Sequence, residues 1–252
     1  MSRIYLFFVI VLMYSCTDSN CQKYDISYIE KCLIKIQVNK TGILSVDTTG
    51  LIAEDYSLGT GIYISSDGLI ITAAHVIEKR NRNLAGTISC KDNISKENFV
   101  PIVIYEDSKN DIAILQNVKY TNYGSKNDYF IDINNIDKQL LIKNNDVIAF
   151  GYPNELHGYD KIGSFSVGKI ISPNTNLEGY EKIKSRSNVS LADCVVLSGC
   201  SGGIITSNSF LPIGIILGSV IDKNKRVTYF KSFGLVKKIL SENGIELWNQ
   251  HL

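Results

Sequence analysis

The sequence has few histidines, no CxxC pair, almost no net charge and only one long apolar run. Its three histidines are His75, His157 and His251, and they do not lie at metal-ligand spacing with the cysteines. A structural zinc site is therefore not expected, and no other metal or cofactor is predicted. The 26 basic and 25 acidic residues give a net charge of +1. Because there is no basic excess, nucleic acid is not an expected partner.

The long apolar run lies at the amino terminus, where Arg3 precedes "IYLFFVIVLMYS" at residues 4–15. This run is shorter than the roughly 20 apolar residues that a membrane-spanning helix needs. A positive start followed by a short apolar stretch is typical of a secretory signal peptide. Residues 1–22 are thus predicted to be a leader with a short tether, and the mature protein is expected to be exported.

The end of this leader, "MYSC", resembles the lipobox of bacterial lipoproteins, in which Cys16 becomes the lipidated first residue of the mature chain. Ser15 fits that pattern, whereas Met13 and Tyr14 depart from it. The two alternatives are a lipoprotein attached to a membrane of the cell envelope through Cys16, and a periplasmic or secreted protein released by plain cleavage.

Exported proteins often contain disulfides, but the cysteines here do not define a pairing. Without Cys16, five remain, namely Cys21, Cys32, Cys90, Cys194 and Cys200. Cys194 and Cys200 flank one loop. Either they pair with each other, or they are small buried thiols.

From Tyr24 onward, short apolar runs alternate with Gly, Asn, Asp and Ser. Runs such as "CLIKIQV", "GLIITAAHVI" and "LPIGIILGSVI" are rich in β-branched residues, which favours an all-β barrel or sandwich. "SSDG" at residues 65–68 separates two runs and predicts a hairpin turn. The stretch 117–130, rich in Asn, Tyr, Ser and Lys, is the least structured in pattern and is a candidate linker between two halves.

One amphipathic helix is expected near the end of the chain. Ser232 is a suitable N-cap, and Gly244 is a suitable stop. Between them, Leu235, Val236, Ile239 and Leu240 share one helical face, which is expected to pack on the core.

Three separated motifs carry the groups needed to hydrolyse an acyl bond. "ITAAHVIEK" contains His75, "KNDIAILQ" contains Asp111, and "LSGCSGG" contains Ser201. A histidine base can take a serine proton, a carboxylate can orient the base, and backbone N–H groups can stabilise an oxyanion. Taken singly, each residue has an ordinary structural interpretation; together they point to nucleophilic catalysis.

At this point the sequence resembles the trypsin-like serine peptidases of chymotrypsin fold, and most closely their HtrA/Deg-type bacterial branch. The blocks "GTGIYISSDGLIITAAHVI", "NDIAIL", "NNDVIAFGYP", "FSVGKIIS" and "GCSGG" follow one another as they do in that family. Asp193 and Gly214 also fall where that branch has them. The resemblance covers nearly the whole mature chain, and five ordered blocks with two further matching residues are far more specific than one motif.

The resemblance implies an all-β, chymotrypsin-like double β-barrel with a C-terminal α-helix. Residues 23–125 would form the first barrel, and 126–252 the second barrel and the helix. The chain ends soon after that helix, so the PDZ domain of many HtrA-type enzymes is not expected. The oligomeric state is left open.

The resemblance also assigns roles to individual residues. His75 would be the general base and then the general acid, Asp111 its orienting partner, and Ser201 the nucleophile. The N–H groups of Gly199 and Ser201 would form the oxyanion hole. The implied activity is a serine endopeptidase that acts on protein or peptide substrates.

Cys200 is the alternative nucleophile within the same motif. Cysteine-using viral relatives of this fold place the cysteine immediately before Gly-Gly, and here Ser201 holds that position. Cys200 occupies the variable position, so Ser201 is preferred.

Two other classes of protein compete with this interpretation. "GCSGG" also satisfies the G-x-S-x-G nucleophile elbow of α/β-hydrolases, but that fold needs a helix directly after the serine and a later histidine. The following "GGIITSNSFLP" discourages a helix, and the only later histidine is His251. The second alternative is a catalytically silent trypsin fold used as a binding module.

The primary substrate pocket is expected to be apolar. In trypsin, an acidic residue lies six positions before the nucleophile; here that position is Val195. We expect a preference for a small or medium aliphatic side chain. The predicted pocket residues are Val195, Val196, Ile216, Leu217 and Gly218, and the strand around Ile216 is expected to pair with an extended substrate.

Overall fold

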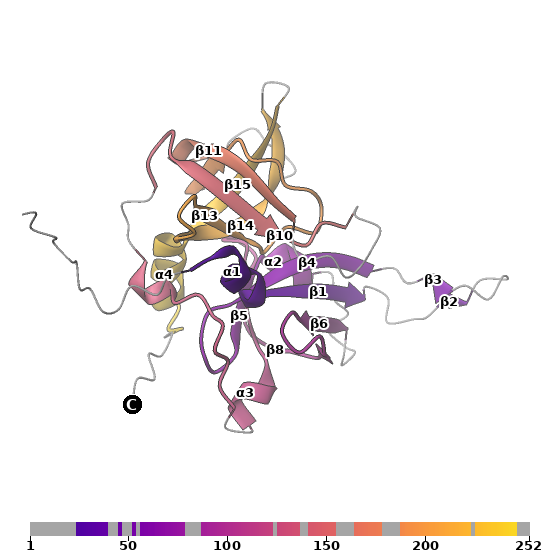
Figure 1. The fold of residues 1–252 in the computed structure, drawn as a ribbon. Helices are drawn as coiled ribbons and strands as arrows, with labels where there is room; N and C mark the ends of the chain where they lie inside the picture. Colours follow the sequence, from indigo (N-terminus) through magenta and orange to yellow (C-terminus); the bar gives the residue numbers. More distant parts are fainter. Residues whose placement is uncertain are drawn as a thin grey trace, which may run out of the picture.

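A computed structural model gives the fold of the chain (Figure 1). It describes residues 24–39, 45–46, 52–53, 56–78, 87–122, 125–136, 141–154, 164–177, 187–222 and 225–245. Cys16, Cys21, His157 and His251 lie outside these ranges. The expectations about the leader, its lipidation and the location of the protein therefore stay predictions.

The first half of the chain forms a seven-stranded antiparallel sheet with the order β7-β6-β1-β4-β5-β9-β8. Its strands are β1 (Leu33–Asn39), β4 (Tyr56–Tyr63), β5 (Leu69–Thr72), β6 (Ile88–Asp92), β7 (Asn98–Phe99), β8 (Ile102–Asp107) and β9 (Ile112–Gln116). A separate two-stranded sheet joins β2 (Ser45–Val46) to β3 (Ile52–Ala53). The predicted turn at residues 65–68 is confirmed, because it joins β4 to β5 and Gly68 has a φ of +87°.

The second half forms a closed antiparallel barrel with the order β10-β11-β12-β15-β14-β13. Its strands are β10 (Asp146–Gly151), β11 (Ser164–Thr175), β12 (Val189–Ala192), β13 (Ile204–Ser207), β14 (Pro212–Asp222) and β15 (Lys225–Ser232). Figure 1 shows this barrel above the seven-stranded sheet.

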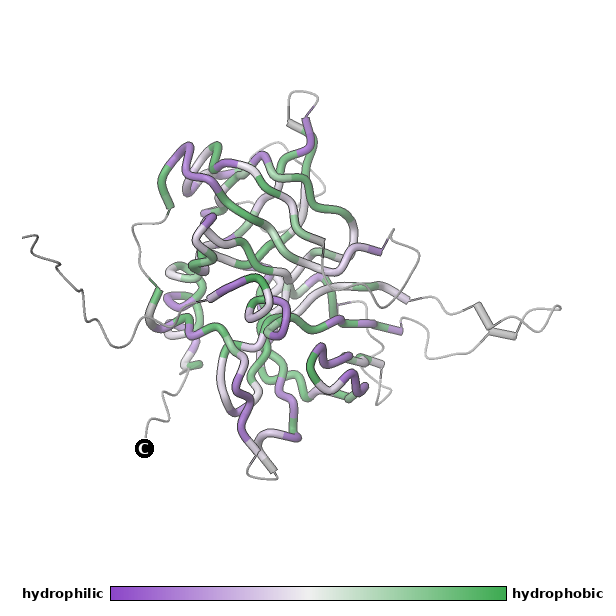
Figure 2. The backbone as a smooth tube through the Cα atoms, in the orientation of Figure 1, coloured by the Kyte–Doolittle hydropathy of each residue, from purple (hydrophilic) through white to green (hydrophobic). Residues whose placement is uncertain are grey.

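Apolar side chains hold the two halves together as well as filling them. One buried cluster joins first-sheet residues such as Ile71 and Ile114 to Leu217, Tyr229 and Phe233 of the second half. A second cluster, which includes Ile170 and Phe230, fills the closed barrel. In Figure 2, hydrophobic residues lie along the strands and hydrophilic residues at many of the turns. Burial of this apolar area is the main force that stabilises the fold.

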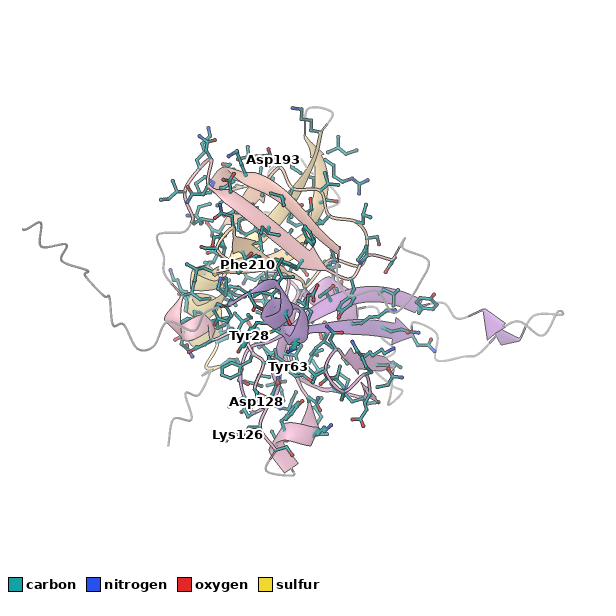
Figure 3. The ribbon with its side chains drawn as sticks, viewed as in Figure 1. Tyr28, Tyr63, Lys126, Asp128, Asp193 and Phe210 are labelled. Carbon is teal, nitrogen blue, oxygen red and sulfur yellow. The ribbon has the colours of Figure 1, made fainter. Side chains whose placement is uncertain are left out.

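The candidate linker at 117–130 is more ordered than its composition indicated. It begins with α3 (Val118–Asn122), and its Asn117 and Asn127 are buried. Asn117 donates to the hydroxyl of Tyr63, 2.8 Å away, and Tyr63 donates to Asp92. Tyr63 is labelled in Figure 3. These buried hydrogen bonds join residues that are far apart in the sequence, and they form only in the folded chain. The pattern of apolar residues therefore does not predict them.

The other small elements lie at the ends and joints of the two halves. A helix that the sequence did not predict, α1 (Ile26–Cys32), precedes β1; the side chain of Asp25 caps it by accepting from the N–H of Tyr28. The helix α2 (Ala74–Glu78) follows β5, and a 3-10 turn, η1 (Ile133–Asn135), lies between the halves.

The predicted C-terminal helix is confirmed as α4 (Phe233–Glu242). The hydroxyl of Ser232 accepts from the N–H of Leu235, which satisfies one of the free donors of the first turn. Val236, Ile239 and Leu240 are buried, and Gly244 has a φ of +72° just beyond the helix.

The chain therefore has the expected all-β, chymotrypsin-like double β-barrel with a C-terminal α-helix. The strands of the first sheet lie within residues 33–116, and those of the barrel within 146–232. None of the helices in the described ranges is long and apolar enough to span a membrane.

Candidate active site

His75 and Asp111 form a close hydrogen-bonded pair. The Nδ1 atom of His75 lies 2.8 Å from Oδ2 and 3.0 Å from Oδ1 of Asp111. The backbone N–H of His75 also donates to Oδ1 of Asp111, at 2.9 Å. The carboxylate thus holds both the ring and the backbone of His75, and it fixes which ring nitrogen carries a proton. The Asp111 side chain is 3% exposed and that of His75 is 32% exposed.

Local structure explains how these two residues meet. His75 lies in the short helix α2, directly after β5, and β5 pairs with β9. Asp111 is the residue before β9 and has a φ of +58°, a left-handed conformation that Asp tolerates better than most residues. This conformation ends the turn after β8 and places the carboxylate beside α2.

Ser201 lies in a glycine-rich loop between β12 and β13. Gly199 and Gly202, on either side of Ser201, have φ values of +94° and +86°. A Cβ on Gly199 would lie 2.3 Å from the carbonyl oxygen of Tyr152, and one on Gly202 would lie 1.9 Å from that of Thr60. Both positions therefore require glycine for conformation and for space.

One open cleft contains all three predicted triad residues. It has a volume of about 450 Å³, and its wall includes His75, Asp111, Ser201, Gly199 and Tyr229. The hydroxyl of Ser201 donates to the carbonyl oxygen of Leu217 at 3.3 Å. Among the described residues, no hydrogen bond joins Ser201 to His75. A rotation about the Cα–Cβ bond of Ser201 would redirect its hydroxyl, and catalytic hydrogen bonds often tighten only when substrate binds.

Only part of the predicted substrate pocket lines this cleft. Leu217 and Gly218 are in its wall, together with Ser219. Val196 and Ile216 instead belong to the core of the closed barrel, and Val195 is exposed outside the cleft wall. Ile216 and Leu217 are neighbours in β14, where successive side chains point to opposite faces of the sheet. Tyr229, which the sequence did not single out, lies beside Gly218: a Cβ on Gly218 would be 2.9 Å from the Tyr229 hydroxyl.

The proposed oxyanion donors have no acceptor within the described part of the protein. The N–H of Cys200 bonds to Leu197, and that of Gly202 bonds to Ile216. The N–H groups of Gly199 and Ser201, at the wall of the cleft, make no hydrogen bond to any described residue. Two such donors beside a nucleophile can bind a developing negative charge.

Thr60 is a site residue that the sequence did not reveal. It lies within β4 and is fully buried. Its N–H donates to the carbonyl of Ser201 at 2.8 Å, and its hydroxyl donates to the carbonyl of Gly199 at 2.8 Å. Its position between two glycines in "GTGIYIS" hints at close backbone approach, but not at the partner.

Cys200 is a buried thiol, 2% exposed. Burial raises its pKa to about 11, and that of Cys194 also to about 11. Both are free cysteines, so of the two alternatives the structure has buried thiols. Since the thiolate is the reactive form of cysteine, Cys200 is a poor nucleophile at neutral pH.

Two ionisable groups of β15 lie near Asp111. Burial raises the pKa of Tyr229 to about 12, and the negative charge of Asp111 adds to this effect. Lys231 is fully buried, and the loss of hydration lowers its pKa to about 8. The charges of Asp111 and Asp107 partly offset that decrease. In the described ranges, no cluster of three or more His, Cys, Asp or Glu is arranged to hold a metal ion.

Solved structures with the same fold include three proteases. The Rv3671c protease in an inactive form has a TM-score of 0.58 and 18% identity, over 87% of this chain and 92% of that one. The HtrA-type protease AlgW with a tripeptide has a TM-score of 0.62 and 16% identity, over 88% of this chain and 62% of AlgW. The MamO protease domain from Magnetospirillum magneticum, in its apo form, has a TM-score of 0.61 and 15% identity, over 84% and 97%.

No curated protein matches the sequence. At identities below 20%, the structural matches establish the fold. The family is established by sequence: the model of the trypsin-like peptidase domain matches residues 59–215, which is more than half of the chain. The protein therefore belongs to the trypsin-like peptidase domain family.

Proposed function

We propose that the protein is a serine endopeptidase that hydrolyses peptide bonds with His75, Asp111 and Ser201. The observation that carries this proposal is the His75–Asp111 hydrogen bond of 2.8 Å in the wall of the same cleft as Ser201. The imidazole of His75, the carboxylate of Asp111 and the hydroxyl of Ser201 are the groups that this reaction needs. The match of the chain to the trypsin-like peptidase domain supports peptide bonds as the substrate class.

In the proposed reaction, Oγ of Ser201 attacks the carbonyl carbon of the scissile peptide bond. Nε2 of His75 accepts the hydroxyl proton and later donates it to the leaving amine. Asp111, bonded to Nδ1, keeps the ring oriented and stabilises the imidazolium that forms. Water then repeats the sequence of steps on the acyl-enzyme and releases the new carboxylate.

The oxyanion that forms in each step would be bound by the N–H groups of Gly199 and Ser201. Loss of one such donor typically costs about 3 kcal/mol of transition-state stabilisation. Gly199 would act through its backbone N–H. The backbone conformation that requires glycine at this position is also the one that would present this N–H to the oxyanion.

The substrate would bind as an extended strand along β14. Residues 218–222 pair with β15 on one side, after a bulge at Leu217, and within the described chain their other side has no partner strand. Main-chain pairing on that open edge would supply affinity, and the wall formed by Leu217, Gly218 and Tyr229 would favour a small or medium aliphatic side chain. Efficient cleavage after Lys or Arg in a peptide library would contradict this specificity.

A fluorophosphonate probe tests the proposed nucleophile, because it phosphonylates an activated serine. We expect the native chain to be labelled, Ser201→Ala to be unlabelled and Cys200→Ala to be labelled. Labelling that depends on Cys200 and not on Ser201 would identify Cys200 as the nucleophile. A folded native chain with no Ser201-dependent labelling would favour a catalytically silent binding module.

We also propose that the protein is exported, either as a lipoprotein attached through Cys16 or as a cleaved soluble form. Mass spectrometry of the mature amino terminus distinguishes the two. An unmodified terminal peptide that starts beyond Cys16 would rule out the lipoprotein.

A further inference from the structure

A single threonine supplies the hydrogen bonds that join the seven-stranded sheet to the loop of Ser201. Thr60 donates from its N–H to the carbonyl of Ser201 and from Oγ1 to the carbonyl of Gly199, both at 2.8 Å. Its Oγ1 also accepts from the N–H of Tyr152 at 2.9 Å. Its own carbonyl accepts from Oγ1 of Thr72 at 2.7 Å. All the polar groups of Thr60 are therefore used.

These bonds connect parts of the site that are far apart in the sequence. Thr60 lies in β4, Tyr152 follows β10, and Gly199 and Ser201 lie in the loop after β12. Among the described residues, every hydrogen bond from the first sheet to residues 197–203 comes from Thr60. His75 and Asp111 lie beside strands β5 and β9 of this sheet. Through the hydrogen bonds of Thr60, the same sheet holds the loop of Ser201.

The loop needs such a connection because of its composition. Glycine has the largest conformational freedom of any residue, and Gly199, Gly202 and Gly203 occur within five positions. A freely moving Gly199 would carry its N–H away from the position at which an oxyanion forms. The bond to the Gly199 carbonyl restrains this residue from one side, while the N–H of Asn154 holds the carbonyl of Ser198 at 2.7 Å from the other.

Thr60 is well suited to this task. It is 0% exposed, so water does not compete for its hydroxyl. Its β-branched side chain lies in a strand, where few rotamers are available. The close approach of Gly202 to the Thr60 carbonyl leaves the loop no room to slide past β4.

We propose that Thr60 is a positioning residue whose hydroxyl holds the Gly199–Ser201 loop with its oxyanion donors in place before substrate binds. This inference rests on the proposed function. It implies that this loop already has its working backbone arrangement in the resting protein and needs no conversion from an inactive one.

The test compares Thr60→Val, which has the shape of threonine without the hydroxyl, with Thr60→Ser, which keeps the hydroxyl. Thr206→Val is the matched control, because Thr206 is also fully buried in a strand but bonds to Ile148 and Ser207, away from the loop. The readouts are the rate of acylation by p-nitrophenyl acetate per active site, the ester concentration at half-maximal rate, and thermal unfolding. Fluorophosphonate titration counts the active sites.

For Thr60→Val we expect acylation per site to fall about 10- to 100-fold, since small errors in catalytic geometry have effects of this size. The ester concentration at half-maximal rate should change by less than about 3-fold, because the lost interaction acts in the transition state. Thr60→Ser should retain acylation within about 3-fold of the native rate. Thr206→Val should lower the unfolding temperature while leaving the rate per site unchanged.

Folded Thr60→Val that reacts as fast as the native chain would overturn the inference, as would Thr60→Ser that is as slow as Thr60→Val. If Thr60→Val does not fold, Thr60→Cys replaces it, and its weak thiol donor should give a rate well below that of Thr60→Ser. Equal rates for those two variants would also overturn the inference. Equal acylation of native chain and Ser201→Ala would refute the proposed function itself.

Discussion

Replacing Lys231 by methionine should stabilise the protein at neutral pH. Lys231 lies in β15, opposite Ile215 of β14, and is 0% exposed. Burial removes most of the hydration of its ammonium group, and the charges of Asp111 and Asp107 compensate only partly. Methionine has a similar length and is apolar, so it can fill the same space without a charge.

The magnitude follows from the pKa of Lys231. Its value falls from the ordinary 10.5 to about 8 in the folded protein. Each unit of difference corresponds to about 1.4 kcal/mol, so the charged form costs at most about 3–4 kcal/mol of folding free energy. Between pH 8 and 10.5 the unfolded chain binds more protons than the folded chain at this residue. The contribution of Lys231 to stability therefore increases with pH across this window, and the cost is fully present below pH 8.

Urea unfolding of Ser201→Ala, with and without Lys231→Met, measures this effect between pH 6 and 10.5. The buried cysteines and tyrosines titrate in the alkaline range in both proteins, so only the difference between them is informative. We expect Lys231→Met to be more stable by up to about 3–4 kcal/mol at pH 7, with a difference that decreases above pH 8. The control Lys238→Met changes an exposed lysine that lies 3.8 Å from Glu242, and it should alter stability by less than about 0.5 kcal/mol. A difference that does not vary with pH would refute the argument.

Three further substitutions test the site. Gly199→Ala should destabilise the protein by about 2–4 kcal/mol or abolish acylation, because the φ of Gly199 is +94° and an added Cβ would meet a carbonyl oxygen. The control is Gly234→Ala on α4, where an added Cβ meets open space. In the same urea titration, this control should be neutral or should stabilise the protein by up to about 1 kcal/mol. Asp111→Asn should lower ester or peptide kcat by about 10⁴-fold, since an amide favours the wrong tautomer of His75, and a loss below 10-fold would argue against its orienting role. Cys200→Ser should leave acylation within about 3-fold of native, because the thiol is buried and protonated; complete loss would identify the thiol as the nucleophile.

The sequence predicted those features that depend on local pattern. The hairpin at 65–68 and the helix after Ser232 are marked by turn and cap residues that act within a few positions. The meeting of His75 and Asp111 followed from the family resemblance, because the residues between them do not by themselves predict that β5 pairs with β9.

The features that the sequence did not predict depend on contacts between distant segments. Thr60 has an ordinary strand environment until the loop of Gly199 is placed against it. Lys231 looks like a surface residue in "RVTYFKSF", yet it is fully buried and lies near Asp111 and Asp107 of the first half. The burial of Ile216 has a local cause, since alternation along β14 directs its side chain into the barrel core, whereas Val196 lies in the loop after β12 and packs in the same core.

The order of the site residues along the chain has a consequence for synthesis. His75, Asp111 and Ser201 are all made before residue 202, yet the loop of Ser201 is tied to β14 through Gly202 and Ile216, and the Ser201 hydroxyl bonds to Leu217. A growing chain on the ribosome therefore holds every proposed catalytic group before it can arrange them. Assembly of the cleft must wait until β14 and β15 have emerged and closed the barrel, so the proposed activity would begin only after the whole barrel has been made.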